Sequence, residues 1–288
     1  MQVEKNDSKS LIMLIVSMTV FGTVGIFRRF IPLDSGGVAA FRGFSGALFL
    51  VSFVKLRGGK LRHNISRKSL VWILCSGAIM GINWLFLFEA YNYTTVATAT
   101  LCYYMEPTIV LLLSPLLFKE KLTLRKWICV VVSFAGMVLV SGVVEGGLPA
   151  FSDIKGILYG LVAACFYAGV VIINKNTPGI DQYEKTTLQL LAAAVTMIPY
   201  LLLKGGVCVS GMDGRAVIML LIVGFIHTGV CYALYFGSMD GLKAQTIAIT
   251  SYIDPVLALV LSAVVLHENI SVLGIIGAVM ILLSTFLM

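Results

Sequence analysis

Charged residues are scarce in this chain: Asp, Glu, Lys and Arg make up 12% of its 288 residues, whereas hydrophobic residues make up 59%. Soluble domains devote about a quarter of their residues to charge. The mean hydropathy is correspondingly high, at +0.97. A soluble core cannot use this much apolar surface. The composition therefore excludes an ordinary soluble protein and predicts an all-α integral membrane protein in contact with the lipid bilayer.

Sequence motifs of catalysis and metal binding are missing as well. There is no Walker phosphate-binding loop, no HExxH and no GxSxG in a strand-turn-helix context. The six cysteines form no CxxC pair, and all except Cys208 fall in apolar stretches, where cysteine packs as a small residue. We therefore expect no enzyme and no cofactor.

Ten apolar runs are long enough to cross a hydrocarbon core of about 30 Å at about 1.5 Å per residue. The runs are approximately 11–28, 36–54, 70–91, 96–117, 125–143, 154–174, 186–203, 215–237, 243–266 and 270–288. The sequence therefore predicts about ten transmembrane helices.

The net charge of +7 would suit a nucleic-acid partner, but most of the charges lie between the apolar runs, so we expect no nucleic acid. If the N-terminus is cytoplasmic, most Lys and Arg residues fall in cytoplasmic segments. The basic residues left outside are Arg28, Arg29, Lys155, Lys204 and Arg215. The excess of Lys and Arg in the cytoplasmic segments predicts a multi-pass protein of the plasma membrane with both termini in the cytoplasm.

An internal repeat relates the two halves of the chain. Residues 98–123 align without a gap to residues 246–271, and an acid is kept where Glu106 meets Asp254. The identical pairs are Thr98 with Thr246, Tyr104 with Tyr252, Pro107 with Pro255, Leu111 with Leu259, Ser114 with Ser262 and Glu120 with Glu268. Because polar and proline positions match, the alignment indicates a duplication.

Each copy carries five spans, and an odd number of spans inserts the second copy upside down relative to the first. The sequence thus predicts two inverted five-helix repeats, residues 1–146 and 147–288. Inverted repeats are the architecture of secondary transporters.

The segments that follow the two Tyr-x-x-Pro helices carry a family resemblance. They read Lys-Glu-Lys-Leu-Thr at 119–123 and His-Glu-Asn-Ile-Ser at 267–271. In this pattern the chain resembles the two EamA-type repeats of the drug/metabolite transporter superfamily over essentially its whole length. The resemblance implies a ten-helix, two-repeat transporter of a small organic solute, often an exporter of amino acids, nucleobases, drugs or other metabolites.

Four ionisable residues inside apolar runs need an explanation, because a charge in a bilayer is costly: Arg42, Glu89, Glu106 and Asp254. Glu106 and Asp254 precede the matching prolines, where each helix should kink. Freed backbone groups are tolerated only against protein or a water-filled cavity. We therefore place both acids at the pseudo-twofold axis, facing a cavity; alternatively, they bond locally and only stabilise the packing.

Glu89 has no acidic counterpart in the second half, where the aligned residue is Gly237. It lies close to Asn83, Trp84 and Tyr91, and an acid among aromatic rings can hold an organic cation. The alternative is an aromatic belt at the membrane interface with a solvated Glu89.

Arg42 could bind a substrate carboxylate, but we expect it to pair with one of the buried acids through its guanidinium fork. Tyrosines complete the predicted lining of the site, because a tyrosine in a span needs a partner for its hydroxyl. Tyr103 shares a helix face with Glu106. The other candidates are Tyr232, Tyr235, Tyr252 and His227, the last of which could equally be a packing residue.

These patterns together predict a secondary-active transporter that works by alternating access, with proton-coupled export as one form. The excess of buried acids over Arg42 favours a cationic or zwitterionic solute, or proton coupling. A passive channel or facilitator is the alternative function, although no filter sequence is present. The expected oligomeric state is a monomer or a homodimer.

Overall fold

Helices make up nearly all of the described chain, and no strand is found in it. The computed structural model describes residues 8–56, 58, 65–118, 122–146, 151–175, 177, 180–207, 209–239, 242 and 244–287. Glu120 and Cys208, both singled out from the sequence, lie outside these residues. The helices are α1 (Ser8–Phe21), α2 (Val24–Arg29), α3 (Ser35–Leu56), α4 (Arg67–Tyr93), α5 (Val96–Tyr103), α6 (Glu106–Phe118), α7 (Leu124–Val140), α8 (Val143–Gly146), α9 (Phe151–Lys175), α10 (Gln182–Leu203), α11 (Gly214–Leu221), the π-helix η1 (Ile222–Val230), α12 (Cys231–Met239), α13 (Ala244–Ser251), α14 (Ile253–Val265) and α15 (Val272–Leu287).

Seven helical segments of the described chain are long and apolar enough to cross a membrane. They are Ser8–Arg29, Ser35–Leu56, Arg67–Tyr93, Val96–Leu117, Phe151–Asn174, Gln182–Leu203 and Gly214–Met239. Three shorter apolar segments, Leu124–Val140, Ile249–Val265 and Val272–Leu287, complete the ten crossings that the hydropathy pattern predicts.

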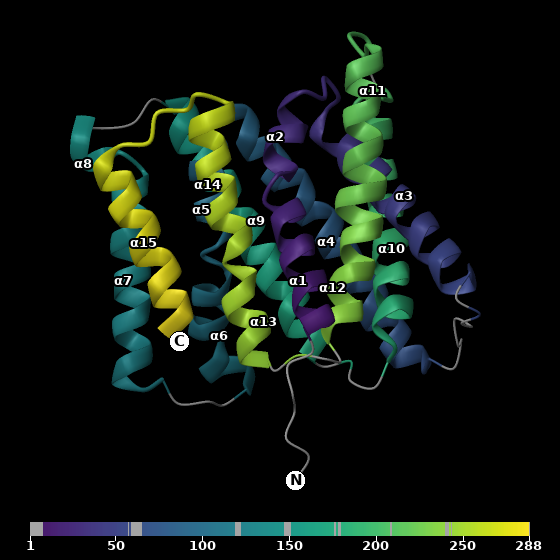
Figure 1. Cartoon of the computed structure of the whole chain (residues 1–288), viewed down its shortest axis with the longest axis horizontal. Helices are drawn as coiled ribbons and strands as arrows, with labels where there is room; N and C mark the ends of the chain where they lie inside the picture. Colours follow the sequence, from purple (N-terminus) through teal and green to yellow (C-terminus); the bar gives the residue numbers. More distant parts are fainter. Residues whose placement is uncertain are drawn as a thin grey trace.

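The crossings of the two halves run in opposite directions (Figure 1). α1 begins and α15 ends toward the bottom of the picture, on what we call the near face, whereas α8, the last helix of the first half, lies at the top, on the far face. The first repeat therefore begins on the near face and ends on the far face, whereas the second repeat begins on the far face and ends on the near face. This arrangement confirms the all-α membrane fold with two inverted five-helix repeats.

Both predicted proline kinks are present as breaks in the helices. Between α5 and α6 the Tyr104 N–H bonds to the Thr100 carbonyl at 3.0 Å, and the Met105 N–H bonds to the Cys102 carbonyl at 3.1 Å. Tyr252 forms the corresponding break between α13 and α14. Pro107 and Pro255 follow these breaks and lack the N–H that a continuous helix requires at their positions.

A third break, at Gly22 between α1 and α2, meets the break in the second repeat. A Cβ atom on Gly22 would lie 2.7 Å from the Asp254 carbonyl oxygen, so only glycine permits this approach. The two half-helix junctions are therefore in direct contact near the middle of the fold. Irregular backbone at this depth needs protein or water around it.

The eighth crossing departs from the single α-helix predicted over 215–237. Its middle nine residues, η1, form a π-helix, in which hydrogen bonds reach from residue i to i+5. Gly224 and Gly229 of η1 pack closely against Phe41 and Phe49 of α3. The wider turn lets groups five residues apart approach one another, as the His227 ring and the Ile222 carbonyl do.

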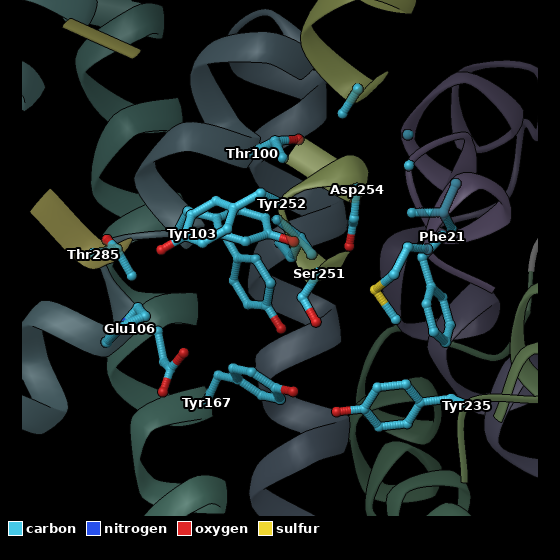
Figure 2. Close-up of a pocket in the computed structure, with 18 of the residues that line it drawn as sticks. Phe21, Thr100, Tyr103, Glu106, Tyr167, Tyr235, Ser251, Tyr252, Asp254 and Thr285 are labelled. Atoms are coloured by element: carbon cyan, nitrogen blue, oxygen red, sulfur yellow. The ribbon is translucent and has the colours of Figure 1, made fainter. Parts of the chain in front are cut away.

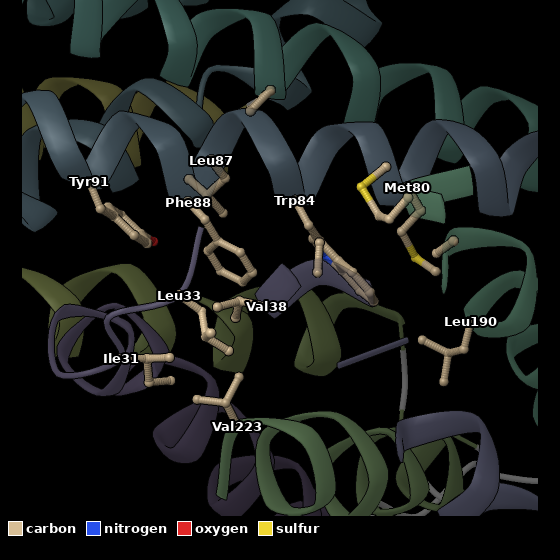
Figure 3. Close-up of a cluster of buried hydrophobic side chains, with 14 of the residues drawn as sticks. Ile31, Leu33, Val38, Met80, Trp84, Leu87, Phe88, Tyr91, Leu190 and Val223 are labelled. Atoms are coloured by element: carbon tan, nitrogen blue, oxygen red, sulfur yellow. The ribbon is translucent and has the colours of Figure 1, made fainter. Parts of the chain in front are cut away.

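The main core runs along one side of α4, where Trp84, Phe88 and Tyr91 lie in a row (Figure 3). Their exposed fractions are 4%, 0% and 3% respectively. Val38 and Leu190 reach the same cluster from α3 and α10. These rings therefore face protein, and Trp84 and Tyr91 do not belong to a lipid-facing aromatic belt.

Candidate functional site

A cavity of about 610 Å³ lies between the two repeats (Figure 2). Residues of both halves line it, and most of the residues predicted for a substrate site are among them. The predicted residues on its wall are Arg42, Trp84, Tyr91, Tyr103, Glu106, Tyr232, Tyr235, Tyr252 and Asp254. Helices that are far apart in the sequence thus converge on one space, with the broken helices α5–α6 and α13–α14 on its wall.

Glu106 and Asp254, which occupy equivalent positions in the two repeats, line this cavity from the first and the second repeat respectively. Glu106 is the first residue of α6, and Asp254 lies in the first turn of α14. Figure 2 shows them on different sides of a cluster of tyrosines that includes Tyr103 and Tyr252. Carboxylates at the start of half-helices lie where the helix dipole favours negative charge.

Tyrosine hydroxyls contribute much of the polar character of the wall. Tyr167 of α9 and Tyr235 of α12 point their hydroxyls toward one another across the cavity in Figure 2. The Tyr104 hydroxyl lies within hydrogen-bonding reach of the Asp254 carboxylate. Buried tyrosines usually place the ring against apolar atoms and the hydroxyl against a polar partner, which gives this cavity both aromatic and hydrogen-bonding surface.

Arg42 is buried, and the predicted pairing with a buried acid is wrong. Its Nε donates a hydrogen bond of 2.8 Å to the Thr228 hydroxyl, and its guanidinium carbon lies 4.2 Å from the centroid of the Trp84 ring. The one salt bridge within the described part of the chain joins Arg29 to Glu268. Stacking on an aromatic face supports the guanidinium without cancelling its charge. Among the described residues its two terminal nitrogens have no hydrogen-bond acceptor, although Arg42 lines the cavity.

Three predicted site residues are not part of the cavity wall, because each has a partner elsewhere. The Asn83 amide donates to the Ala163 carbonyl at 2.6 Å. Glu89 accepts hydrogen bonds from the Ser35 hydroxyl at 2.8 Å and from the Asn92 amide at 3.2 Å.

His227, the third of these residues, is held by the break between α1 and α2. Its Nε2 lies 2.7 Å from the Thr23 hydroxyl, and its ring lies 4.9 Å from that of Phe27. In the π-helix its Nδ1 also reaches the Ile222 carbonyl, five residues earlier, at 3.3 Å. These contacts with Thr23 and Phe27 hold the His227 ring outside the cavity wall.

Several wall residues were absent from the sequence prediction: Thr100, Tyr104, Arg125, Tyr167, Ser251 and Thr285. Tyr104 and Tyr167 carry the same signal as the tyrosines that were chosen, a phenol within an apolar span. Tyr104 is in addition the repeat partner of Tyr252. In the sequence, Arg125 is indistinguishable from the other charged residues between apolar runs, and no pattern indicates that Thr285 lines a cavity.

The two ends of the cavity differ in their access to the outside. At the near face the wall includes Arg125, which is exposed, and Leu287, which is 47% exposed. Toward the far face it ends at Gly25, Tyr91 and Thr100, all of them buried. The cavity is therefore open toward the near face and closed toward the far face. Within the described residues, no group of three or more His, Cys, Asp or Glu side chains comes together.

Comparison with known proteins agrees with this architecture. The EamA-like transporter family matches residues 8–142 and again residues 154–288. The uncharacterized transporter YxxF of Bacillus subtilis (strain 168) is 30% identical over 263 residues, which cover 90% of this chain and 83% of that protein. An uncharacterized transporter of Archaeoglobus fulgidus is 24% identical over 93% of this chain and 92% of its own length.

A solved crystal structure shares the fold at a TM-score of 0.68 and 18% identity, covering 97% of this chain and 96% of that one. At this identity the likeness concerns the fold alone. The family match over both halves and the apolar helices lead to one conclusion: this chain belongs to the EamA-like transporter family and is a multi-pass membrane transporter.

Proposed function

We propose that this transporter is a secondary carrier that moves a small zwitterionic organic solute, of the size and chemistry of an amino acid, by alternating access. The observation that carries the proposal is Arg42, whose terminal nitrogens have no acceptor in the described chain although the residue lines the cavity. A cavity of about 610 Å³ lies in the range that small organic ligands occupy.

Arg42 is the residue that would receive the carboxylate of the solute. Thr228 and the Trp84 ring hold its guanidinium in place, and the planar fork matches a carboxylate in a bidentate pair. Because the fork is held before the solute arrives, little side-chain entropy remains to be lost on binding. A purely cationic solute would leave this charge unmatched.

Glu106 and Asp254 would receive the ammonium group. Both line the same cavity as Arg42 and outnumber it, so a solute with one group of each sign fits the balance of charge better than an anion. The tyrosine and tryptophan rings of the wall would contact the apolar part of the solute. Substrate specificity would then come from the shape of the aromatic wall.

Proton coupling follows from the same acids. A carboxylate that must lose its proton before it binds a cation links solute binding to proton release, which gives proton antiport and hence export. We propose that the near face is cytoplasmic, as the distribution of Lys and Arg indicates, in the plasma membrane. The cavity then faces inward in this structure, and residues 1–146 and 147–288 are the two units that move relative to one another.

Counterflow in proteoliposomes tests the proposal. Vesicles loaded with an unlabelled amino acid should accumulate the labelled one transiently and saturably, because a carrier exchanges solute without net flux. Asp254→Asn or Glu106→Gln should remove flux driven by a pH gradient. Asp153→Asn, at the start of α9 on the far face, is the matched control and should transport normally.

Two results would contradict the proposal. Flux that neither saturates nor shows counterflow would indicate a passive pore. Saturable flux that is unchanged in Asp254→Asn and Glu106→Gln would support a carrier but contradict the role proposed for the two acids.

A further inference from the structure

A second cavity, of about 320 Å³, lies on the far face outside the central one. Arg28, Arg29, Pro32 and Asn92 are on its wall, together with Tyr91. Tyr91 is also on the wall of the central cavity. Tyr91 therefore borders both spaces.

Tyr91 is closely packed by its neighbours. Its hydroxyl lies 3.4 Å from the Thr100 hydroxyl, and only 3% of the residue is exposed. On the neighbouring α2, a Cβ atom on Gly25 would lie 2.4 Å from a methyl group of Val96 and 3.5 Å from the Tyr91 ring. α2, α4 and α5 thus meet at van der Waals distance around the ring.

An ion pair joins the two repeats directly above this contact. Arg29 Nη2 lies 2.9 Å from Glu268 Oε1 and also donates to the Thr94 carbonyl at 2.9 Å. Glu268 Oε2 accepts from the Val96 N–H at 2.9 Å and from the Ser262 hydroxyl. Glu268 therefore links α2 and α5 of the first repeat to the connection between α14 and α15 of the second repeat.

The backbone before Glu268 is shaped to make this link. His267 has a φ of +53°, in the left-handed region that side chains other than glycine rarely adopt. The Glu268 N–H then bonds back to the Ser262 carbonyl at 3.1 Å. The chain turns back over the end of α14, which directs the carboxylate toward α5. Unfavourable backbone of this kind persists where the surrounding contacts require it.

The pair is partly withdrawn from water, with exposed side-chain fractions of 33% for Arg29 and 12% for Glu268. Charge-assisted bonds in such surroundings are stronger than an exposed surface pair. Moving α2 and α5 away from α14 would break the two bonds that cross between the repeats, Arg29 to Glu268 and the Val96 N–H to Glu268. The pair therefore favours the arrangement in which the far face is closed.

We infer that Tyr91 is the far-face gate of the transport path and that the Arg29–Glu268 ion pair holds this gate closed. The inference rests on the proposed alternating-access mechanism and adds to it the residues that set the balance between the two states. Loss of the pair shifts the population toward the state with an open far face. Loss of the Tyr91 ring connects the outer and central cavities directly.

Thiol labelling from one side of the membrane tests the gate without any solute. Ser251→Cys places a thiol on the wall of the central cavity without touching the bond between Tyr91 and Thr100, in a Cys208→Ser background that removes the cysteine of a polar loop. The probe is a membrane-impermeant methanethiosulfonate carrying a sulfonate, applied to the far face of oriented vesicles. The background without Ser251→Cys reports labelling of the remaining cysteines.

We expect slow labelling from the far face in this parent protein. Glu268→Gln and Arg29→Gln should each raise the rate by roughly tenfold, the effect of losing one or two charge-assisted bonds. Tyr91→Ala should raise it further. Arg215→Gln removes another far-face arginine, which stacks on Phe30 at 4.8 Å, and should leave the rate unchanged.

The gate is contradicted if Glu268→Gln and Arg29→Gln label at the parent rate, or if Arg215→Gln raises labelling equally. Thermal unfolding of each variant identifies a rise caused by misfolding, and Arg29→Lys, which keeps the charge, should restore most of the protection. Counterflow measured on the same vesicles separates the outcomes: normal counterflow with unchanged labelling rejects the gate and keeps the carrier, whereas absent counterflow in the parent rejects the carrier.

Discussion

The guanidinium carbon of Arg42 lies 4.2 Å from the centroid of the Trp84 ring, while its Nε bonds to Thr228. α3, α4 and η1 thus come together on one side chain. The aromatic face and the hydroxyl hold the arginine without neutralising it. A fixed positive charge that forms no salt bridge within the described chain is costly for folding alone, and we attribute it to solute binding.

Arg42→Lys should lower the affinity for a zwitterionic solute by about 10-fold to 100-fold, because an ammonium keeps the charge but loses the bidentate pair and the stacking. Isothermal titration of the purified protein with a panel of amino acids and the corresponding amines measures this effect. The amines, which lack a carboxylate, should not distinguish the variant from the parent. An equal loss for both classes of ligand would indicate damage to the cavity as a whole.

Glu89→Gln should leave solute affinity unchanged, in contrast to Asp254→Asn. Glu89 bonds to Ser35 and Asn92 and is absent from the cavity wall, and a glutamine keeps one acceptor oxygen for these partners. The same titration compares the two variants. If Glu89→Gln, and not Asp254→Asn, lowered the affinity for organic cations, Glu89 would be the cation site that the sequence predicts.

His227→Ala should reduce stability rather than transport. It removes the bond to Thr23 and the ring contact with Phe27, and it leaves space in a packed region. The loss should amount to about 2–4 kcal/mol. Thermal unfolding in detergent gives the shift, and counterflow at a temperature below both midpoints should be close to that of the parent. A fully stable variant without transport would place His227 in the mechanism.

The contact between α7 and α15 should be intolerant of any added side chain. A Cβ atom on Gly277 would lie 2.5 Å from the Gly136 carbonyl oxygen, and backbone cannot move aside as a flexible side chain can. Gly277→Ala should therefore destabilise the fold by roughly 1–3 kcal/mol. Gly214→Ala is the matched control, since a Cβ atom there meets nothing within 4 Å. Equal unfolding midpoints for the two variants would contradict the packing described above.

The features that could be predicted from the sequence are those that the bilayer imposes locally. The ten crossings could be predicted from apolar runs of sufficient length. The two helix breaks could be predicted from the prolines after Glu106 and Asp254, because a missing backbone N–H disrupts the helix that contains it. The odd number of spans in each repeat gave the inversion. None of these inferences requires knowledge of how the helices pack.

The errors in the predicted site arise from packing between helices. Spacing along a helix tells which residues share a face, but not which neighbour that face meets. Arg42 was expected to find an acid and instead stacks on Trp84. His227 instead contacts Thr23 and Phe27 at the break between α1 and α2, and no residue pattern revealed this contact. Tyr167 could have been predicted by the reasoning applied to Tyr103, as a phenol within an apolar span.

The central claim, that the two repeats exchange access to one cavity, is tested most directly by two spin-label distances measured in the same protein. One pair, Phe30→Cys with Val265→Cys, reports on the far face, and the other, Leu124→Cys with Ile249→Cys, reports on the near face; all four residues are substantially exposed. Electron paramagnetic resonance should give two distances for each pair. Solute should lengthen the far-face distance while it shortens the near-face distance. A single, unchanged distance for both pairs with and without solute would contradict alternating access.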